Sequence, residues 1–256
     1  MKLKLRLALI PLLLLFAVPP PGPVVAARKF SGSSQFLQAA SVDLSAANKL
    51  SLSYWLYWDA YDNVSDLFAY EFTATTSSNN GFACDPNSSA PSSGFMRFIF
   101  NCGSVVGGHI TRPSAAAWHH YVVEFDASVN PDTIAVWVDG SSVSFTYTAQ
   151  PNGTGNFANS TMNFMSRNGS SLFGAGRLAE YAIYPGVLLA ANDIAALAAG
   201  YSPALVRPGV KPYYWPLLGR ASPETELFYG KTAAVTSATQ TEHVRVYHAG
   251  RMQVTP

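Results

Sequence analysis

Charged residues are scarce in this 256-residue chain, at 12% of the sequence, which is about half of the usual share near 25%. The formal net charge is +1 at pH 7, from 16 basic and 15 acidic residues. A nucleic-acid-binding surface needs clustered basic residues that replace phosphate counterions, so this balance predicts no nucleic-acid partner. Neutral hydrogen-bonding residues supply the polar surface instead, and such groups suit sugar ligands.

Cysteine is also scarce, with only Cys84 and Cys102 in the whole chain. Because the sequence carries an export signal (below), we expect a disulfide between them. Two unbonded thiols or a metal-binding pair are the alternatives. A metal pair is disfavoured because no second cysteine or histidine pair has ligand spacing. Phosphate-binding loops, cysteine-rich zinc patterns and the Gly-x-Ser-x-Gly elbow of serine hydrolases are missing as well.

Long apolar runs are limited to one, from Leu7 to Val18. Three basic residues precede it, and Val25-Ala26-Ala27 offers the small residues that a signal peptidase prefers. We therefore expect residues 1–27 to be a signal peptide, because the run is short for a membrane span. An uncleaved N-terminal anchor is the alternative. After cleavage 13 basic and 15 acidic residues remain, a net charge of −2, and we expect a secreted or surface-exposed protein without membrane contact.

The clearest pattern present is period-2 alternation between Trp118 and Gly140. Residues 119–125 place odd-numbered positions on one face and even-numbered positions on the other. In the following run, Ile134, Val136 and Val138 share a face, opposite Trp137 and Asp139. This alternation predicts half-buried antiparallel strands. Asp139-Gly140 fits a two-residue hairpin turn, and residues 142–148 predict a third strand, so the segment is a meander.

Two further segments complete the expected core of the domain. Leu50 to Trp58 alternates as a strand, and Leu189 to Ala199 predicts one short helix with Gly200 as its C-cap residue. Residues 201–256 are rich in proline, which breaks helices and central strands. We expect this C-terminal extension to pack as a strap on the sandwich.

The Trp118-His119-His120 start, followed by alternating apolar residues and a strand ending Val138-Asp139-Gly140, resembles a laminin-G-like domain of the concanavalin A-like lectin/glucanase superfamily. Residues 176–184 are similar to the last strand of that family. The resemblance implies an all-β fold, a two-sheet antiparallel jelly-roll sandwich over residues 28–200. It fixes function only as a class, because the superfamily includes sugar binders, glycosidases, adhesion modules and structural spacers.

Candidate ligand-binding residues follow from the faces of these strands. Trp55 and Tyr57 point away from the apolar face of their strand, and Trp137 with Asp139 points away from the apolar face of another. Aromatic rings stack on the C–H-rich faces of sugars, so Trp55, Tyr57, Trp137 and Asp139 are the predicted binding residues. The alternative is that a loop covers the rings.

Related glucanases carry a Glu-x-Asp-x-x-Glu strand, but here Val129 follows Glu124 and Asp126 where the second glutamate would stand. Two carboxylates flanking the scissile bond are the usual requirement, so we predict no enzyme activity and no catalytic residues.

Calcium is the only cofactor that the resemblance suggests, and Asp43, Asp59 and Asp62 are the loop carboxylates that could bind it. Solvated turn residues are the alternative reading of these three. Many relatives have Asp-Glu where this chain has Ala179-Glu180, which weighs against a family-type site.

The sequence thus predicts a secreted, non-catalytic carbohydrate-binding or adhesion module with a glycan or an extracellular protein as partner. A structural or surface-display domain without a small ligand is the alternative. A glycoside hydrolase is a distant third.

Overall fold

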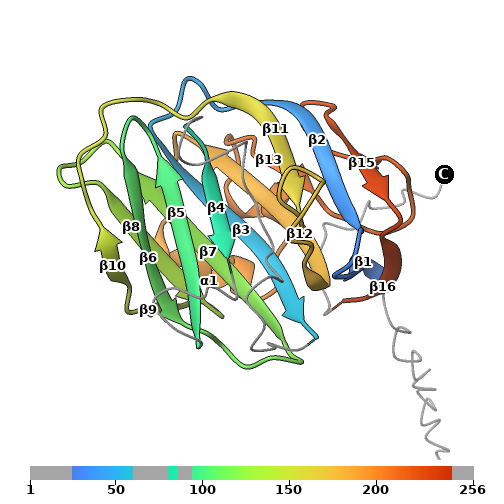
Figure 1. Ribbon diagram of the computed structural model, residues 1–256. Coiled ribbons are helices and arrows are strands. Elements are labelled where there is room, and N and C mark those ends of the chain that lie inside the picture. The colour runs from blue at the N-terminus through green and yellow to red at the C-terminus, as the bar shows by residue number, and fades with distance from the viewer. Residues whose placement is uncertain (1–24, 60–79, 86–93, 244–256) are drawn as a thin grey trace, which may run out of the picture.

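The structure, a computed structural model, describes residues 25–59, 80–85 and 94–243. These residues form a sandwich of two antiparallel β-layers with two short helices outside it (Figure 1). The predicted all-β jelly-roll fold is confirmed. Most of the expected signal peptide lies outside the described residues, while its last three residues belong to the first strand, β1 (Val25–Ser31).

One layer is an eight-stranded sheet that contains the Trp118–Gly140 meander. Its strand order is β16 (Thr239–Glu242), β1, β12 (Ala175–Pro185), β3 (Lys49–Trp58), β7 (Trp118–Asp126), β8 (Thr133–Val138) and β9 (Ser141–Val143), with β13 (Tyr213–Trp215) also paired to β12.

Two four-stranded sheets make the other layer, and Figure 1 shows them beside each other in front of the large sheet. The first has the order β10 (Thr146–Ala149), β6 (Val105–Thr111), β5 (Phe95–Asn101) and β4 (Phe82–Asp85). The second has the order β11 (Asn159–Phe164), β2 (Phe36–Asp43), β15 (Thr232–Thr236) and β14 (Glu224–Thr225).

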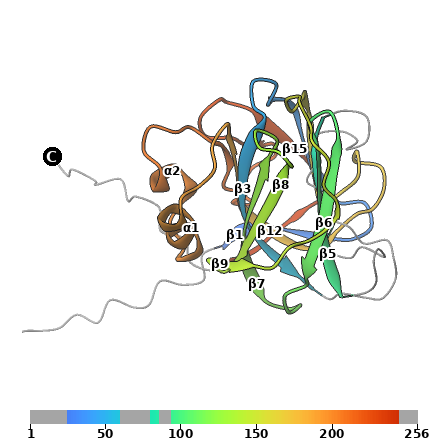
Figure 2. The same cartoon turned by 90° about the vertical axis from the view of Figure 1, so that its left-hand side faces the viewer.

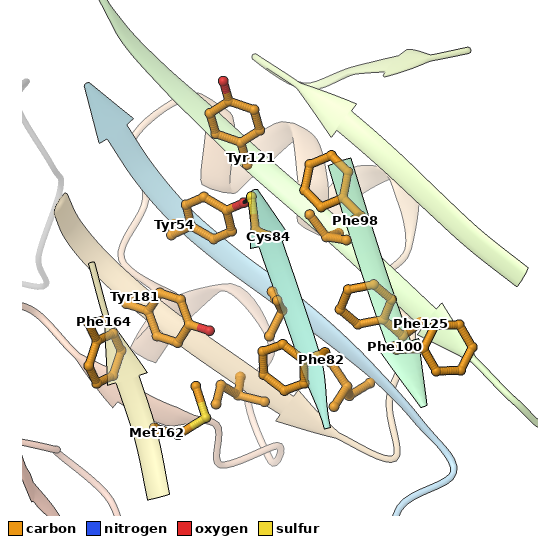
Figure 3. Packing of buried hydrophobic residues seen from close by; sticks show 14 of the residues in the cluster. Tyr54, Phe82, Cys84, Phe98, Phe100, Tyr121, Phe125, Met162, Phe164 and Tyr181 are labelled. Carbon is orange, nitrogen blue, oxygen red and sulfur yellow. Dashed lines mark hydrogen bonds between the residues drawn. The ribbon is translucent and has the colours of Figure 1, made fainter. Parts of the chain in front are cut away.

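The main hydrophobic core fills the space between the layers and is rich in aromatic rings (Figure 3). Tyr54 of β3 stacks between Tyr121 of β7 and Tyr181 of β12, with centroid distances of 5.3 and 5.7 Å. The facing layer contributes Phe82, Phe98 and Phe100, all fully buried. The predicted alternation is therefore confirmed in β7, where the odd-numbered residues from Tyr121 onward point into the core.

The second hydrophobic cluster lies on the other face of the large sheet, beneath the helices α1 (Ala191–Ala198) and α2 (Pro203–Val206) (Figure 2). The expected helix is α1, and Gly200 follows it with a φ of +92°. The methyl side chain of Ala190 cannot accept a capping hydrogen bond, but the Asp193 carboxylate accepts a hydrogen bond from the Ala190 N–H at 3.1 Å. Neither of these described helices is long and apolar enough to span a membrane.

Glu124 fastens the segment that leads into α1 to the large sheet. Its Oε1 accepts hydrogen bonds from Ser51 Oγ on β3 at 3.0 Å and from the Leu189 N–H at 2.7 Å. A helix of eight residues is too short to be stable alone, so it depends on such tertiary contacts. Ile194 and Leu197 are its buried residues, and they pack in the cluster that includes Val122.

The C-terminal residues, expected to pack as a strap on the sandwich, also form strands of its sheets. Pro212 and Pro216 limit β13 to three residues, yet β13 pairs with β12, and β15 pairs with β2 in the opposite layer. A buried ion pair joins the layers here, since Arg28 Nε of β1 lies 2.7 Å from Glu224 Oε1 of β14. The extension therefore supplies strands to both layers.

The predicted disulfide is wrong. Cys84 of β4 is paired with Phe98 of β5, and Cys102 lies four residues beyond Phe98. At about 3.3 Å per residue the two Cα atoms are roughly 13 Å apart, whereas a disulfide needs about 4.4–6.8 Å. Cys84 Sγ instead accepts a 3.6 Å hydrogen bond from the Tyr54 hydroxyl, and burial raises the pKa of the Cys102 thiol to about 12.

The buried Glu124 carboxyl makes stability depend on pH. Burial raises the pKa of Glu124 above its ordinary value, so the folded protein keeps a proton that the unfolded chain has already lost. This contribution is fully present below the ordinary carboxyl pKa and is lost as the pH rises through the folded pKa. Urea denaturation between pH 4 and 8 should show that fall in the unmodified protein and a smaller one in Glu124→Gln, which keeps the acceptor oxygen.

Glu124→Ala is the matched variant, because it removes the acceptor as well as the charge. We expect it to lower the free energy of unfolding by about 1–3 kcal/mol at every pH in that range. Identical pH profiles for Glu124→Gln and the unmodified protein would contradict the assignment to Glu124.

Candidate functional site

The outer face of the large sheet, which is turned away from the main core, is covered at one end by α1, α2 and the segment that follows them (Figure 2). At the other end, backbone registers align four outward side chains in one row across neighbouring strands. Lys29 of β1 is opposite Arg177 of β12, Arg177 is opposite Tyr57 of β3, and Tyr57 is opposite Trp118 of β7. Directly opposite residues in antiparallel strands share a face, so these side chains lie side by side. We call Lys29, Arg177, Tyr57 and Trp118 the cross-strand row.

Contacts within the row hold its rings in fixed orientations. Tyr57 and Trp118 meet edge to face at a centroid distance of 5.7 Å and an angle of 65°. The Arg177 guanidinium carbon lies 4.2 Å from the Tyr57 ring centroid, a cation–π contact. Tyr57, Trp118 and Arg177 are half-buried, whereas Lys29 is exposed.

Further rings support the row from the side nearer to α1. Trp55 lies on the same face of β3, with the His120 ring at 5.1 Å and the His243 ring at 5.6 Å. His243 also packs on Trp118 at 4.4 Å, so the residue after β16 lies over part of this face. The result is a half-buried aromatic surface in which neither ring of the row is fully covered.

His120 adds no charge to this surface. Burial lowers its pKa to about 3, so the imidazole is neutral at physiological pH. Its Nε2 lies 3.0 Å from Ser53 Oγ. Its Nδ1 has no hydrogen-bond partner among the residues that the structure describes.

The structure places the predicted binding residues in different surroundings. Trp55 and Tyr57 lie together on the outer face, as alternation predicts. Trp137 also points outward, but it is opposite Val122 and packs against the cluster beneath α1. Its ring is half-buried, as Tyr57 and Trp118 are, so its membership in one ligand site with Trp55 and Tyr57 stays a prediction.

Asp139 has a structural role at the turn between β8 and β9. Its Oδ1 accepts a hydrogen bond from the His120 N–H at 2.9 Å, and its Oδ2 lies 2.7 Å from His119 Nδ1. His119 Nε2 is in turn 3.1 Å from Ser114 Oγ and 3.2 Å from the Ser114 carbonyl oxygen. This network ties the β8–β9 turn to β7 and to the preceding loop.

The predicted calcium carboxylates are not brought together. Asp43 precedes β3 and Asp59 follows it, so about 30 Å of a ten-residue strand separates them. Asp43 Oδ1 accepts hydrogen bonds from Ser45 N–H and Ser45 Oγ, which lower the pKa of Asp43, and Asp59 faces Arg177 at 3.7 Å. Asp62 lies outside the described residues. Within the described ranges no group of three or more histidine, cysteine or acidic residues is arranged to hold a metal.

Sequence reasoning missed Trp118 and Arg177. Trp118 has the same parity as His120 and Val122, so extending the outward face of β7 by two residues would have found it. Arg177 precedes the buried Leu178, which by alternation directs it outward. Their meeting with Tyr57 depends on the strand order β12-β3-β7, which no local pattern contains.

Comparison with solved structures gives related folds at low sequence identity. A candidate carbohydrate-binding protein from Bacteroides ovatus is 10% identical with a TM-score of 0.62, and the match covers 86% of this chain and 60% of that one. The heptameric SAP-like pentraxin of Limulus polyphemus is 10% identical with a TM-score of 0.45, covering 84% and 97%. Mouse laminin alpha1 domains LG4-5 are 13% identical with a TM-score of 0.44, covering 64% and 43%.

The chain thus spans 60% of the length of the Bacteroides ovatus protein. No curated protein sequence matches it. The laminin-G-type model described as the Concanavalin A-like lectin/glucanases superfamily matches residues 31–195, which run from the end of β1 into α1. Since this match covers most of the chain, the protein belongs to the Concanavalin A-like lectin/glucanases superfamily.

Proposed function

We propose that this chain is an exported, non-catalytic carbohydrate-binding or adhesion module, and that the cross-strand row is its binding surface. The observation that carries the proposal is the edge-to-face pair of the half-buried Tyr57 and Trp118 rings on the outer face. Both rings are half-buried and held by neighbours, so little side-chain freedom is left to lose when a sugar stacks on them.

The superfamily and the Bacteroides ovatus relative support a binding role. That relative is described as a candidate carbohydrate-binding protein, and its likeness to this chain is in the fold. Glycan binding also suits the low charge of the sequence, because neutral polar groups and aromatic rings are the usual partners of sugar hydroxyls and C–H faces. An extracellular glycoprotein would present the same chemistry to the row.

A structural or surface-display domain without a small ligand is the second candidate. The packing of the half-buried Trp137 against the cluster beneath α1 favours it, because one of the predicted ligand rings then contributes to packing. His243 also covers part of Trp55 and Trp118. The two candidates differ in whether Tyr57 and Trp118 contact a ligand.

Export rests on the basic start and apolar run of residues 1–27. Cleavage after Ala27 would remove the first three residues of β1 and keep the pairing of residues 28–31 with β12 whole. Mass spectrometry of the N-terminus after expression in an exporting host tests this placement. The protein would then act as a secreted or surface-bound module.

Trp118→Ala tests the binding surface directly. On a glycan array read with calcium and again with EDTA, the unmodified protein should bind at least one glycan class, and Trp118→Ala should lose that binding. The free energy of unfolding should fall by only about 1 kcal/mol, because the ring is half-buried and leaves no core cavity. Loss of signal in EDTA alone would identify a calcium requirement, and no binding to any glycan would favour the display function.

Trp137→Ala is the matched aromatic control on the same face. Its half-buried ring packs against the cluster beneath α1, so truncation should lower the free energy of unfolding by about 1–3 kcal/mol. Urea denaturation measures this loss, and the folded variant should keep the glycan signal. Binding lost in Trp137→Ala but kept in Trp118→Ala would move the ligand to the wrong end of the sheet.

The non-catalytic assignment has a specific test, because Ser114, His119 and Asp139 are linked in the order of a serine-hydrolase triad. A carbonyl oxygen only accepts hydrogen bonds, so His119 Nε2 donates in its second contact, to the Ser114 carbonyl, and a donating nitrogen does not serve as the base for the Ser114 hydroxyl. Assays with chromogenic esters and polysaccharides should therefore give no turnover above buffer. Turnover that disappears in Ser114→Ala would overturn this assignment.

A further inference from the structure

We propose that the cross-strand row selects carboxylated sugars, which means glycan chains that contain uronic acids. This inference rests on the proposed glycan-binding function and assigns a ligand class to the same surface. The row joins two aromatic rings to two adjacent cations, Arg177 and Lys29.

The N–H groups of Arg177 have no hydrogen-bond acceptor among the described residues. It makes no hydrogen bond to another described residue, and its Nε is buried without a partner. Asp59 Oδ1 is the nearest carboxylate oxygen at 3.7 Å from Nε, which is beyond hydrogen-bond length. The side chain of Arg177 is only 26% exposed, so water reaches its five N–H groups poorly. Such a half-buried fork is suited to a bidentate acceptor.

Lys29 adds a second positive charge that also favours an anionic ligand. It is directly opposite Arg177 on the same face, and like charges in that position repel each other across a strand pair. The Asp59 side chain is 37% exposed and offsets one of the two charges only in part. A ligand anion seated between Arg177 and Lys29 relieves the repulsion and supplies the missing acceptors.

The spacing of the row matches a sugar ring with a carboxylate at its edge. Neighbouring strands are about 4.8 Å apart, so a sugar ring at Tyr57 places a substituent one strand away, at Arg177. The guanidinium fork is planar and pairs bidentately with the two oxygens of a carboxylate. Tyr57 holds this fork by the cation–π contact at 4.2 Å.

Calorimetry with oligogalacturonate and its methyl ester tests the inference, because the two probes share a sugar chain and differ in charge. The unmodified protein should bind the acid at least about tenfold more tightly than the ester, the value of one charge-assisted contact. Arg177→Gln should erase the difference, Arg177→Lys should restore only part of it, and Asp59→Asn should tighten binding of the acid.

Arg207→Gln is the charge-matched control, because Arg207 pairs with Asp193 at the α1 end of the same face. It should leave the preference for the acid unchanged, and thermal unfolding should verify that every variant is folded. Equal affinity for the acid and the ester, with no change of either affinity in Arg177→Gln, would overturn the inference. The proposed glycan-binding function would still stand.

Two other outcomes are equally informative. Dextran sulfate binding as tightly as the oligogalacturonate, against no binding of plain dextran, would replace carboxylate selection by general polyanion binding and so overturn the inference. No binding of any acidic, neutral or sulfated glycan to the unmodified protein would defeat the proposed function and the inference together.

Discussion

The arrangement of the outer face depends on one buried carboxylate. Glu124 joins β7 to Ser51 of β3 and to the backbone of Leu189, which fixes where the chain turns into α1. A buried polar group is tolerated only when it is hydrogen-bonded, and these two donors meet that requirement. With the helix fixed there, Val122 is buried and the half-buried Trp137 packs against the same cluster.

The end of the face away from α1 combines two cations with two aromatic rings. Arg177 and Lys29 carry charge, which favours an outward position, and Tyr57 and Trp118 face outward because of their parity on β3 and β7. Strand pairing then sets them side by side without any local sequence signal. The same sheet thus has a packing half and a half suited to recognition, and β3 and β7 run through both.

Alternation predicted the direction of most side chains correctly, because the period of two follows from strand geometry. Trp55, Tyr57 and Trp137 all point out of the core as their positions demand. Direction is not exposure, however. Trp137 packs against the cluster beneath α1, a helix more than fifty residues further along the chain, whereas Tyr57 packs against Trp118 and Arg177. The disulfide prediction was wrong for a related reason. The number of residues between two cysteines does not tell where they lie along paired strands.

The amino-acid sequence by itself determined the fold class, the meander from Trp118 to Val143, the helix ending before Gly200 and the superfamily, because these depend on local periodicity and turn chemistry. Only the tertiary structure decided that Trp118 and Arg177 flank Tyr57, that Trp137 lies beneath α1, and that Cys84 and Cys102 stay apart. Strand order and register bring together residues that are distant in the chain, and that juxtaposition arises when the whole sandwich buries its core at once.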